Sequence, residues 1–406
     1  MLNTQRKIIR PDTAEGVRDA VQAALADAAP LAVEGTGSKA AIGKPVQAAA
    51  TLSTAGLSGI TLYEPEELVL SARAGTPMAE IEAALQARGQ RLEFEPIDYG
   101  PLLGQPAGEG TLGGTISCNL SGPRRIKQGA ARDHILGIAA VSGRGEIYRA
   151  GGRVVKNVTG YDLSKGMTGA WGTLSILTDI TIKVMPDAET ETTLVLRNLQ
   201  DDEAAGALSA AMGSSAEASG AAHLPYGVAA GVLDGRFGKQ AATLVRLEGF
   251  GPSVAARAGH LAQAMERVGA VERLERDESR LLWRQVRDVA PFAGPDHRAV
   301  WRLSVTPTRG PEIVMALRMH MAADALYDWQ CGLIFLRLEH GVEAERIRAV
   351  IAQHGGGHAT LVRAGLEDER LSTPVFQPQP PALAALSQRL RAQFDPQSIL
   401  NPGRMG

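Results

Sequence analysis

Residues 108–122 have the sequence Gly-Glu-Gly-Thr-Leu-Gly-Gly-Thr-Ile-Ser-Cys-Asn-Leu-Ser-Gly, which combines five glycines with small polar residues. Side chains this small let a backbone approach a flat ligand closely, and their hydroxyl and amide groups supply hydrogen bonds. A loop of this length without a function is uncommon in a compact domain. We therefore predict that this segment is a ligand-binding loop, and a purely structural loop is the alternative.

A shorter glycine loop at residues 35–39 (Gly-Thr-Gly-Ser-Lys) follows a predicted buried strand at 31–33. Its successive backbone N–H groups can bind a phosphate, with Lys44 or the loop's own lysine as a countercharge. The loop fits neither familiar nucleotide motif, because Ala40 stands where GxGxxG needs a glycine and Pro45 stands where a P-loop needs a hydroxyl. A plain turn is the alternative to a phosphate site.

The overall composition is ordinary for a globular protein, since 44% of the 406 residues are hydrophobic and 21% are charged. This length predicts two or three domains of roughly 150 residues each, and the composition excludes global disorder. Unbroken aliphatic runs stop at about seven residues, far short of the ~20 that a transmembrane helix needs. The net charge of −2 does not indicate a nucleic-acid binder, so we expect no nucleic-acid partner.

The two cysteines, Cys118 and Cys331, lie far apart and form no CxxC pair. By themselves they cannot supply a disulfide framework, a zinc site or an iron–sulfur cluster. After the basic N-terminus, a helix pattern stands where a signal peptide would need an apolar stretch. We therefore expect a reduced, cytoplasmic protein without a metal site.

Residues 124–183 carry ten basic side chains against four acidic ones, in a chain that is otherwise acidic. A solvent-exposed basic face explains this excess as well as a surface for an anionic ligand or an acidic partner does. Charge alone leaves both interpretations open.

Hydrophobic periodicity predicts an α+β protein in two parts. In the first part the predicted elements are a helix between Asp12 and Pro30, strands at 31–33, 60–63 and 68–72, a helix at 76–89, a hairpin at 138–148 and a strand pair over 174–184. Residues 187–222 are rich in acidic residues, alanine and serine, which predicts a domain boundary or a long surface loop. The predicted elements beyond are strands at 243–247, 300–305 and 333–338 and helices at 254–268, 311–323 and 342–354. This alternation is typical of a layer with an antiparallel sheet.

A further set of short segments is more specific than either glycine loop. The segments concerned are 151–163 (GGRVVKNVTGYDL), 113–114 (GG), 119–124 (NLSGPR), 171–174 (WGTL) and the terminal 395–403. Together they closely resemble the FAD-binding domain of the vanillyl-alcohol-oxidase and p-cresol-methylhydroxylase superfamily, and within it the FAD-binding subunits of bacterial glycolate oxidases. The resemblance implies a two-subdomain PCMH-type FAD-binding domain at 1–186, with 376–406 packing back on it. An α+β cap with an antiparallel sheet would occupy 187–375.

By position, the resemblance implies that residues 35–38 hold the FAD pyrophosphate and that residues 108–122 line the pyrophosphate, the ribityl chain and the flavin ring. Three further positions would flank the adenosine half and the ring. The implied FAD-binding residues are Gly35, Thr36, Gly37, Ser38, Lys39, Gly43, Gly108, Thr111, Gly113, Gly114, Ser117, Asn119, Ser121, Gly122, Gly160, Tyr161, Gly172, Thr173 and Ile180.

The chain also departs from the family. Members that oxidise 2-hydroxy acids alone carry His-x-Gly-Asp-Gly-Asn and Gly-Glu-His-Gly-x-Gly motifs in the cap, which supply metal ligands and a base. The first is absent, and of the second only 339–341 (Glu-His-Gly) remains, preceded by Leu338 instead of glycine, which we interpret as coincidence. Members with a covalent flavin place a histidine where Lys39 stands here. We therefore expect non-covalent FAD, and the sequence identifies no catalytic residue.

The resemblance implies an FAD-dependent oxidoreductase that acts as one subunit of a glycolate oxidase or dehydrogenase. It would take part in oxidising glycolate to glyoxylate by flavin-mediated electron transfer. The expected partners are a second FAD-binding subunit, an iron–sulfur subunit and a small 2-hydroxy acid, in a complex that can associate peripherally with the inner face of the membrane. One alternative is a free-standing FAD-dependent 2-hydroxy-acid dehydrogenase, with Arg284, Arg287 and Arg302 as candidate substrate-facing residues. A flavin-free scaffold subunit is the other.

Overall fold

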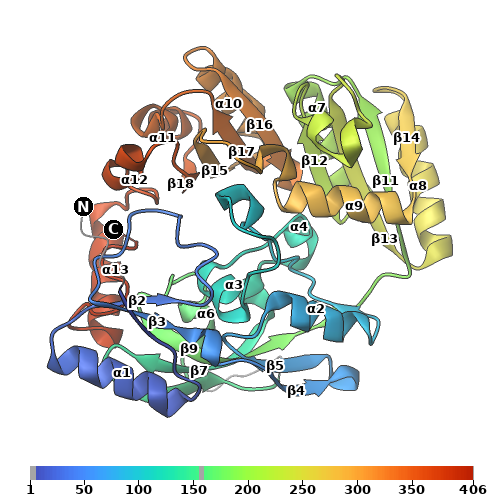
Figure 1. The fold of residues 1–406 in the computed structure, drawn as a ribbon. Coiled ribbons are helices and arrows are strands. Elements are labelled where there is room, and N and C mark those ends of the chain that lie inside the picture. The colour runs from blue at the N-terminus through green and yellow to red at the C-terminus, as the bar shows by residue number, and fades with distance from the viewer. Residues whose placement is uncertain (1–5, 155–159, 406) are drawn as a thin grey trace.

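The computed structural model describes residues 6–154 and 160–405, which form a mixed α+β structure (Figure 1). We call residues 6–186 the N-terminal part and residues 187–375 the cap. The elements of the N-terminal part are β1 (Lys7–Ile9), α1 (Ala14–Ala26), β2 (Leu31–Glu34), β3 (Ala50–Ser53), β4 (Ile60–Glu64), β5 (Val69–Arg73), α2 (Met78–Gln86), β6 (Gln90–Arg91), α3 (Leu112–Cys118), α4 (Arg125–Gln128), α5 (Ala131–His134), β7 (Ile135–Ser142), β8 (Ile147–Gly151), α6 (Leu163–Met167), β9 (Ser175–Lys183) and β10 (Met185–Pro186).

Two larger sheets organise the N-terminal part, and β6 and β10 form a third, two-stranded sheet. Strands β1, β3 and β2 form a parallel three-stranded sheet, and β4, β5, β9, β7 and β8 form an antiparallel five-stranded sheet in that order. The predicted hairpin is confirmed as the antiparallel pair β7 and β8, and the chain turns between them at Gly145, where φ is +73°. Strand β9 lies between β5 and β7, so its apolar side chains are buried in the core.

The cap is built on one antiparallel sheet of eight strands in the order β14-β11-β13-β12-β16-β17-β15-β18. Its elements are β11 (Thr190–Arg197), α7 (Asp201–Met212), β12 (Gly220–Leu224), β13 (Ala242–Gly249), α8 (Gly251–Met265), β14 (Val271–Leu274), α9 (Arg276–Arg287), β15 (Val300–Val305), α10 (Gly310–Arg318), β16 (Ala323–Asp328), β17 (Leu333–Leu338), α11 (Ala344–Gln353), β18 (Gly357–Arg363) and α12 (Glu367–Ser372). Helices α7, α8, α10 and α11 pack on one face of the sheet. The other face packs on α9 and on apolar residues of the N-terminal part (Figure 1).

The C-terminal segment returns to the beginning of the chain. Helix α13 (Pro381–Phe394) lies beside the N-terminal elements (Figure 1), and the ring of Phe394 packs on Tyr148. Beyond it, the Leu31 N–H donates to the Ile399 carbonyl (2.7 Å), and Ile399 and Leu400 join the core around α1.

Three predictions about secondary structure are wrong. Residues 174–184 form the single strand β9 instead of a strand pair, because no turn interrupts the strand. Residues 187–222 form β11, α7 and β12, so of the two alternatives for this stretch the long surface loop is wrong. Residues 108–122 contain the helix α3, which begins where the Thr111 hydroxyl accepts a hydrogen bond from the Gly114 N–H (3.2 Å).

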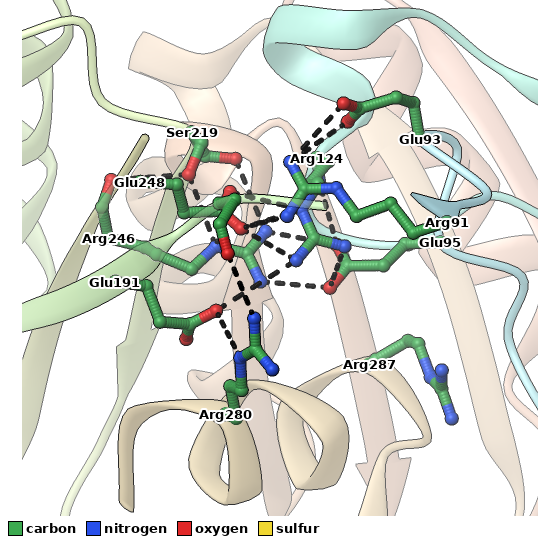
Figure 2. A network of polar contacts seen from close by, with 12 residues as sticks. Arg91, Glu93, Glu95, Arg124, Glu191, Ser219, Arg246, Glu248, Arg280 and Arg287 are labelled. Atoms are coloured by element: carbon green, nitrogen blue, oxygen red, sulfur yellow. Dashed lines mark hydrogen bonds and ion pairs between the residues drawn. The ribbon is translucent and has the colours of Figure 1, made fainter. Parts of the chain in front are cut away.

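A buried network of charges joins the two parts (Figure 2). Arg124 from the N-terminal part contacts both Glu248 on β13 (2.7 Å) and Glu95 (3.1 Å), and Arg246 on β13 contacts Glu95 (2.8 Å). Arg91 (2.7 Å) and Arg246 (3.4 Å) also contact Glu248. Burial opposes the charge of Glu95, but Arg124 and Arg246 outweigh it and lower its pKa to about 2. The network therefore fixes the cap on the N-terminal part through paired charges.

Candidate functional site

A cleft with a volume of about 270 Å³ lies where the loop at 35–39, the first turn of α3 and the C-terminal segment meet. Residues that line it include Val33, Cys118, Trp171, Asn401 and Arg404. It therefore brings together segments from both ends of the chain, including both glycine loops that the sequence singled out.

The backbone of the first loop presents unpaired donors to this cleft. Among the described residues, the N–H groups of residues 35 to 39 donate to no acceptor, whereas the next, that of Ala40, donates to the Gly37 carbonyl (2.8 Å). Gly37 has φ +82°, a conformation that favours glycine. Successive N–H groups in such a turn form a concave site for an anion. This loop can bind a diphosphate without any side chain.

Close packing of α3 brings its small residues to the cleft. The Gly113 N–H donates to the Ala74 carbonyl (2.7 Å), and a Cβ on Gly113 would lie 2.8 Å from that same oxygen. Only glycine permits this approach. Gly113, Gly114 and Ser117 line the cleft beside the loop at 35–39, so their backbone can lie against a flat ligand.

Cations from distant segments surround the loop. The Arg404 guanidinium donates to the Lys39 carbonyl (2.9 Å) and lies over the Trp171 ring, and Arg370 donates to the Ala40 carbonyl (3.1 Å). Burial lowers the pKa of Arg404, as expected for a cation that is not fully countered. Arg6 also lines the cleft, where the acidic residue is Glu34. The excess of positive charge favours an anionic ligand.

Asn401 holds the far wall of the cleft in place. Its amide oxygen accepts from the Val33 N–H (2.7 Å) and its amide nitrogen donates to the Trp171 carbonyl (2.9 Å). This side chain therefore ties the end of β2 to the Trp171–Gly172 turn. Sequence analysis missed Arg6, Arg370, Asn401 and Arg404 as site residues; for Asn401, its place in the family-like segment 395–403 was the available signal.

The cleft brings together about half of the FAD-binding residues expected from the sequence. Those that line it are Gly35, Thr36, Gly37, Ser38, Lys39, Thr111, Gly113, Gly114, Ser117 and Gly172. Those that do not are Gly43, Gly108, Asn119, Ser121, Gly122, Gly160, Tyr161, Thr173 and Ile180. For both groups, contact with FAD stays a prediction.

Several residues outside the cleft have structural contacts instead. Asn119 ends α3 with φ +51°, and its side-chain oxygen accepts from the Arg132 N–H (3.1 Å). The Ser121 hydroxyl accepts from the Ala131 N–H (2.9 Å). Ile180 is fully buried in the core, whereas Tyr161 is 91% exposed. Residues 155–159 of the family-like segment lie outside the described residues.

The basic stretch at 124–183 does not form one surface. Arg124 is buried in the charge network, whereas the Arg144 side chain donates to the Gln393 carbonyl of α13 (2.8 Å). Lys165 pairs locally with Asp162 (2.6 Å). These three charges therefore serve separate contacts within the chain.

The cap remnant of the family motif makes a structural contact. Glu339 forms an ion pair with Arg298 (3.0 Å) at the end of β17. Within residues 6–154 and 160–405, no group of three or more His, Cys, Asp or Glu side chains is placed to hold a metal ion. The same residues contain no helix long and apolar enough to cross a membrane.

These features fit a ligand that has a diphosphate and a flat ring, as FAD does. The loop at 35–39 offers free N–H donors, α3 offers a backbone without bulky side chains, and the surrounding charge is positive. Lys39 lies against Ser38, with its Nζ 3.1 Å from the Ser38 hydroxyl.

Comparisons with known proteins point to the same cofactor. A family model described as "FAD binding domain" matches residues 6–151. The chain is 34% identical, over 97% of its own length and 97% of the relative's, to the glycolate oxidase subunit GlcE of Escherichia coli (strain K12). It is 30% identical to the glycolate oxidase subunit GlcD of Bacillus subtilis (strain 168), over 44% of this chain and 37% of that protein.

A solved structure shares the fold. p-Cresol methylhydroxylase with substrate bound superposes with a TM-score of 0.72 over 98% of this chain and 88% of that chain, at 13% identity. This likeness shows that the expected fold class, a PCMH-type FAD-binding domain with a mixed α+β cap, is right.

Proposed function

Because this chain belongs to the family of FAD-binding glycolate oxidase subunits that includes GlcE, we propose that it is the FAD-binding subunit of a multi-subunit glycolate oxidase or dehydrogenase. In that role it takes part in the oxidation of a small 2-hydroxy acid, glycolate, to glyoxylate. The observation that carries the proposal is the row of free backbone N–H groups from residue 35 to residue 39 at the cleft.

The chain's own residues would hold the cofactor in two ways. The N–H groups of residues 35–39 bind the diphosphate, while Lys39 and Arg404 offset its charge. The small residues of α3 admit the flat ring. Held in this way, FAD would supply a two-electron acceptor for the oxidation of a 2-hydroxy acid. Because Lys39 stands where relatives with a covalent flavin have histidine, we propose that the FAD is bound without a covalent link.

The proposal includes a division of the chain into two domains. Residues 1–186 together with 376–406 form the FAD-binding domain, and 187–375 form the cap. The distribution of strands supports this division, since the eight-stranded sheet takes all its strands from 190–363. The partners are a second FAD-binding subunit and an iron–sulfur subunit, in a cytoplasmic complex at the inner face of the membrane. The GlcD relative supports the existence of a second flavin-type subunit.

The visible spectrum of the purified full-length chain tests the flavin assignment. We expect the absorption bands of an oxidised flavin, and acid precipitation should release the colour into the supernatant. Colour that stays in the pellet would contradict the non-covalent link. A colourless protein that gains no bands when FAD is added would contradict the flavin itself and favour a scaffold subunit.

A matched pair of glycine substitutions tests where the flavin lies. A Cβ on Gly114 would lie 3.2 Å from the Thr111 hydroxyl and 3.4 Å from Lys39 Nζ, so Gly114→Leu fills the cleft. We expect this variant to lose flavin while its cap keeps its fold, since overpacking costs about 1–3 kcal/mol. The control is Gly166→Leu on the exposed side of α6, where no atom lies within 4 Å. Full flavin occupancy in Gly114→Leu would place the ring elsewhere.

A further inference from the structure

Two arginines lie over one tryptophan where the cap meets the N-terminal part. The guanidinium of Arg125 from α4 lies 4.2 Å from the centre of the Trp329 ring, and that of Arg302 from β15 lies 5.1 Å from it. The Trp329 side chain is held in place because its Nε1 donates to the Gly122 carbonyl (3.0 Å). One cation from each part of the molecule thus converges on the same buried ring.

Neither of these arginines directly contacts a carboxylate, although Asp133 acts on Arg125 and Asp328 acts on Arg302 at longer range. Within the described chain, the side chains of Arg125 and Arg302 form no hydrogen bond and no ion pair. Burial lowers the pKa of Arg125, and the nearby charge of Arg302 lowers it further. Two partly buried cations that repel each other are unfavourable unless an anion joins them.

Arg302 lies on the face of the cap sheet that packs on the N-terminal part. Its β-sheet neighbours are Phe335 on β17 and Thr360 on β18, and Val300 on the same face of β15 is fully buried. This face packs on the N-terminal part through a cluster that includes Phe335 and Trp329. Two other arginines on this face, Arg337 and Arg363, pair with Asp296 (3.2 and 3.7 Å), whereas Arg302 forms no ion pair among the described residues.

The hydroxyl of Tyr99 supplies a second, independent observation. Tyr99 is only 4% exposed, and its hydroxyl has no hydrogen-bond partner among the described residues. Burial raises the pKa of Tyr99 to about 12, with Arg302 opposing that shift and Cys118 adding to it. The Tyr99 ring packs edge-on against the ring of Phe335 (6.4 Å between centres), and Phe335 is the cross-strand neighbour of Arg302. A buried hydroxyl without a partner calls for an explanation, and a bound ligand provides one.

We propose that Arg125, Arg302 and Tyr99 form an anion subsite next to the cleft and that its ligand is a small carboxylate. The two guanidiniums supply the charge and several N–H donors, and the phenol supplies one O–H donor. The inference rests on the proposed function, because a 2-hydroxy acid carries such a carboxylate. Of the arginines suggested by the sequence, Arg287 does not belong here, since it pairs with Asp288 (2.6 Å).

Calorimetric titration of the full-length chain with oxalate tests this subsite. Oxalate is a small carboxylate without a hydrogen on carbon, so binding is measured without turnover. We expect saturable binding to the wild type and at least tenfold weaker binding to Arg302→Gln and to Arg125→Gln. Tyr99→Phe removes only an unpartnered oxygen, so it should fold normally and bind severalfold more weakly. Arg309→Gln, at an exposed pair with Glu312, is the matched control and should bind as the wild type does.

The flavin content of the same samples separates this inference from the proposed function. Wild-type protein with flavin but without oxalate binding, or equal affinity in wild type and Arg302→Gln, overturns the subsite and leaves the proposed function standing. Protein that stays without flavin after FAD is added, and whose oxalate binding still depends on Arg302, supports the subsite and overturns the proposed function. A change in the flavin spectrum of Arg302→Gln with unchanged oxalate affinity would assign the arginine to the flavin and overturn the subsite.

Discussion

Arg124 and Arg125 are adjacent in sequence and lie at the same junction, but they have opposite surroundings. Arg124 is buried among carboxylates and contacts Glu95 and Glu248, which raise its pKa. Arg125 has an aromatic ring and another arginine as neighbours, and its pKa is lowered. One step along the chain thus separates a cation in direct contact with carboxylates from a cation without such a contact.

This difference in partners distinguishes an arginine with a structural role from an arginine that is available to bind a ligand. A buried ion network with all members paired holds two parts of a chain in one geometry, although it adds little net stability over an apolar core. An unpaired pair of cations costs stability, and a ligand can offset that cost. The junction therefore combines a rigid network around Glu95 with an incomplete site around Trp329.

Mutation of the buried charge network around Glu95 should give the largest change in the free energy of unfolding. Arg246 is 1% exposed, and Arg246→Met leaves Glu95 without one of its two arginines. Breaking one member of a buried network costs about 3–5 kcal/mol, because a buried charge remains uncompensated. We expect a loss of that size in the free energy of unfolding, measured by urea denaturation.

The control for this change is Arg309→Met. Arg309 and Glu312 form an exposed pair, with side chains 53% and 49% exposed, so this substitution should change stability by less than about 0.5 kcal/mol. Equal losses in the two variants would show that the buried network has no special role.

The same network should have a smaller effect on how the free energy of unfolding changes with pH. The pKa of Glu95 falls from 4.5 to about 2 on folding, so its contribution is present above pH 4.5 and is lost as the pH falls toward 2. Between pH 5 and pH 3 this carboxylate accounts for about 2 kcal/mol of lost stability. The free energy of unfolding, measured by denaturation at each pH, should therefore fall more steeply with decreasing pH for the wild type than for Glu95→Gln. Parallel profiles would mean that the pKa of Glu95 does not change on folding.

Much of the fold could be predicted because hydrophobic patterns were strong. Strand β15 has the predicted bounds, 300–305, and the hairpin of β7 and β8 is marked by alternation and by its glycine turn. Helix α7 was missed because its buried face is built largely of alanines, Ala204, Ala207 and Ala211, whose small side chains give weak periodicity. Its acidic first turn, which favours a helix N-terminus, was the signal available in the sequence.

The site could be predicted only where it is local in sequence. The loop at 35–39 and the residues of α3 could be recognised in the sequence by their glycine content. Residues from both line the same cleft. Arg370 and Arg404 reach the loop from more than 300 residues away, as the separations of their hydrogen-bonded partners show. Such contacts depend on tertiary folding, which no short motif records. Arg125 was included in the basic stretch, but its lack of a partner is visible only in the structure.

The smallest effect is expected at the unpaired arginine. Arg125→Gln removes a cation that repels Arg302 and loses a cation–π contact worth about 0.5–1 kcal/mol, so the two changes largely cancel. Without ligand, we expect the free energy of unfolding to stay within about 0.5 kcal/mol of the wild type. With oxalate at one hundred times its dissociation constant, the wild type should gain about 2.7 kcal/mol by mass action, and the variant should gain much less. Thermal denaturation with and without oxalate measures both terms. A large loss of stability without ligand would mean that Arg125 is structural, like its neighbour Arg124, and would remove the contrast between them.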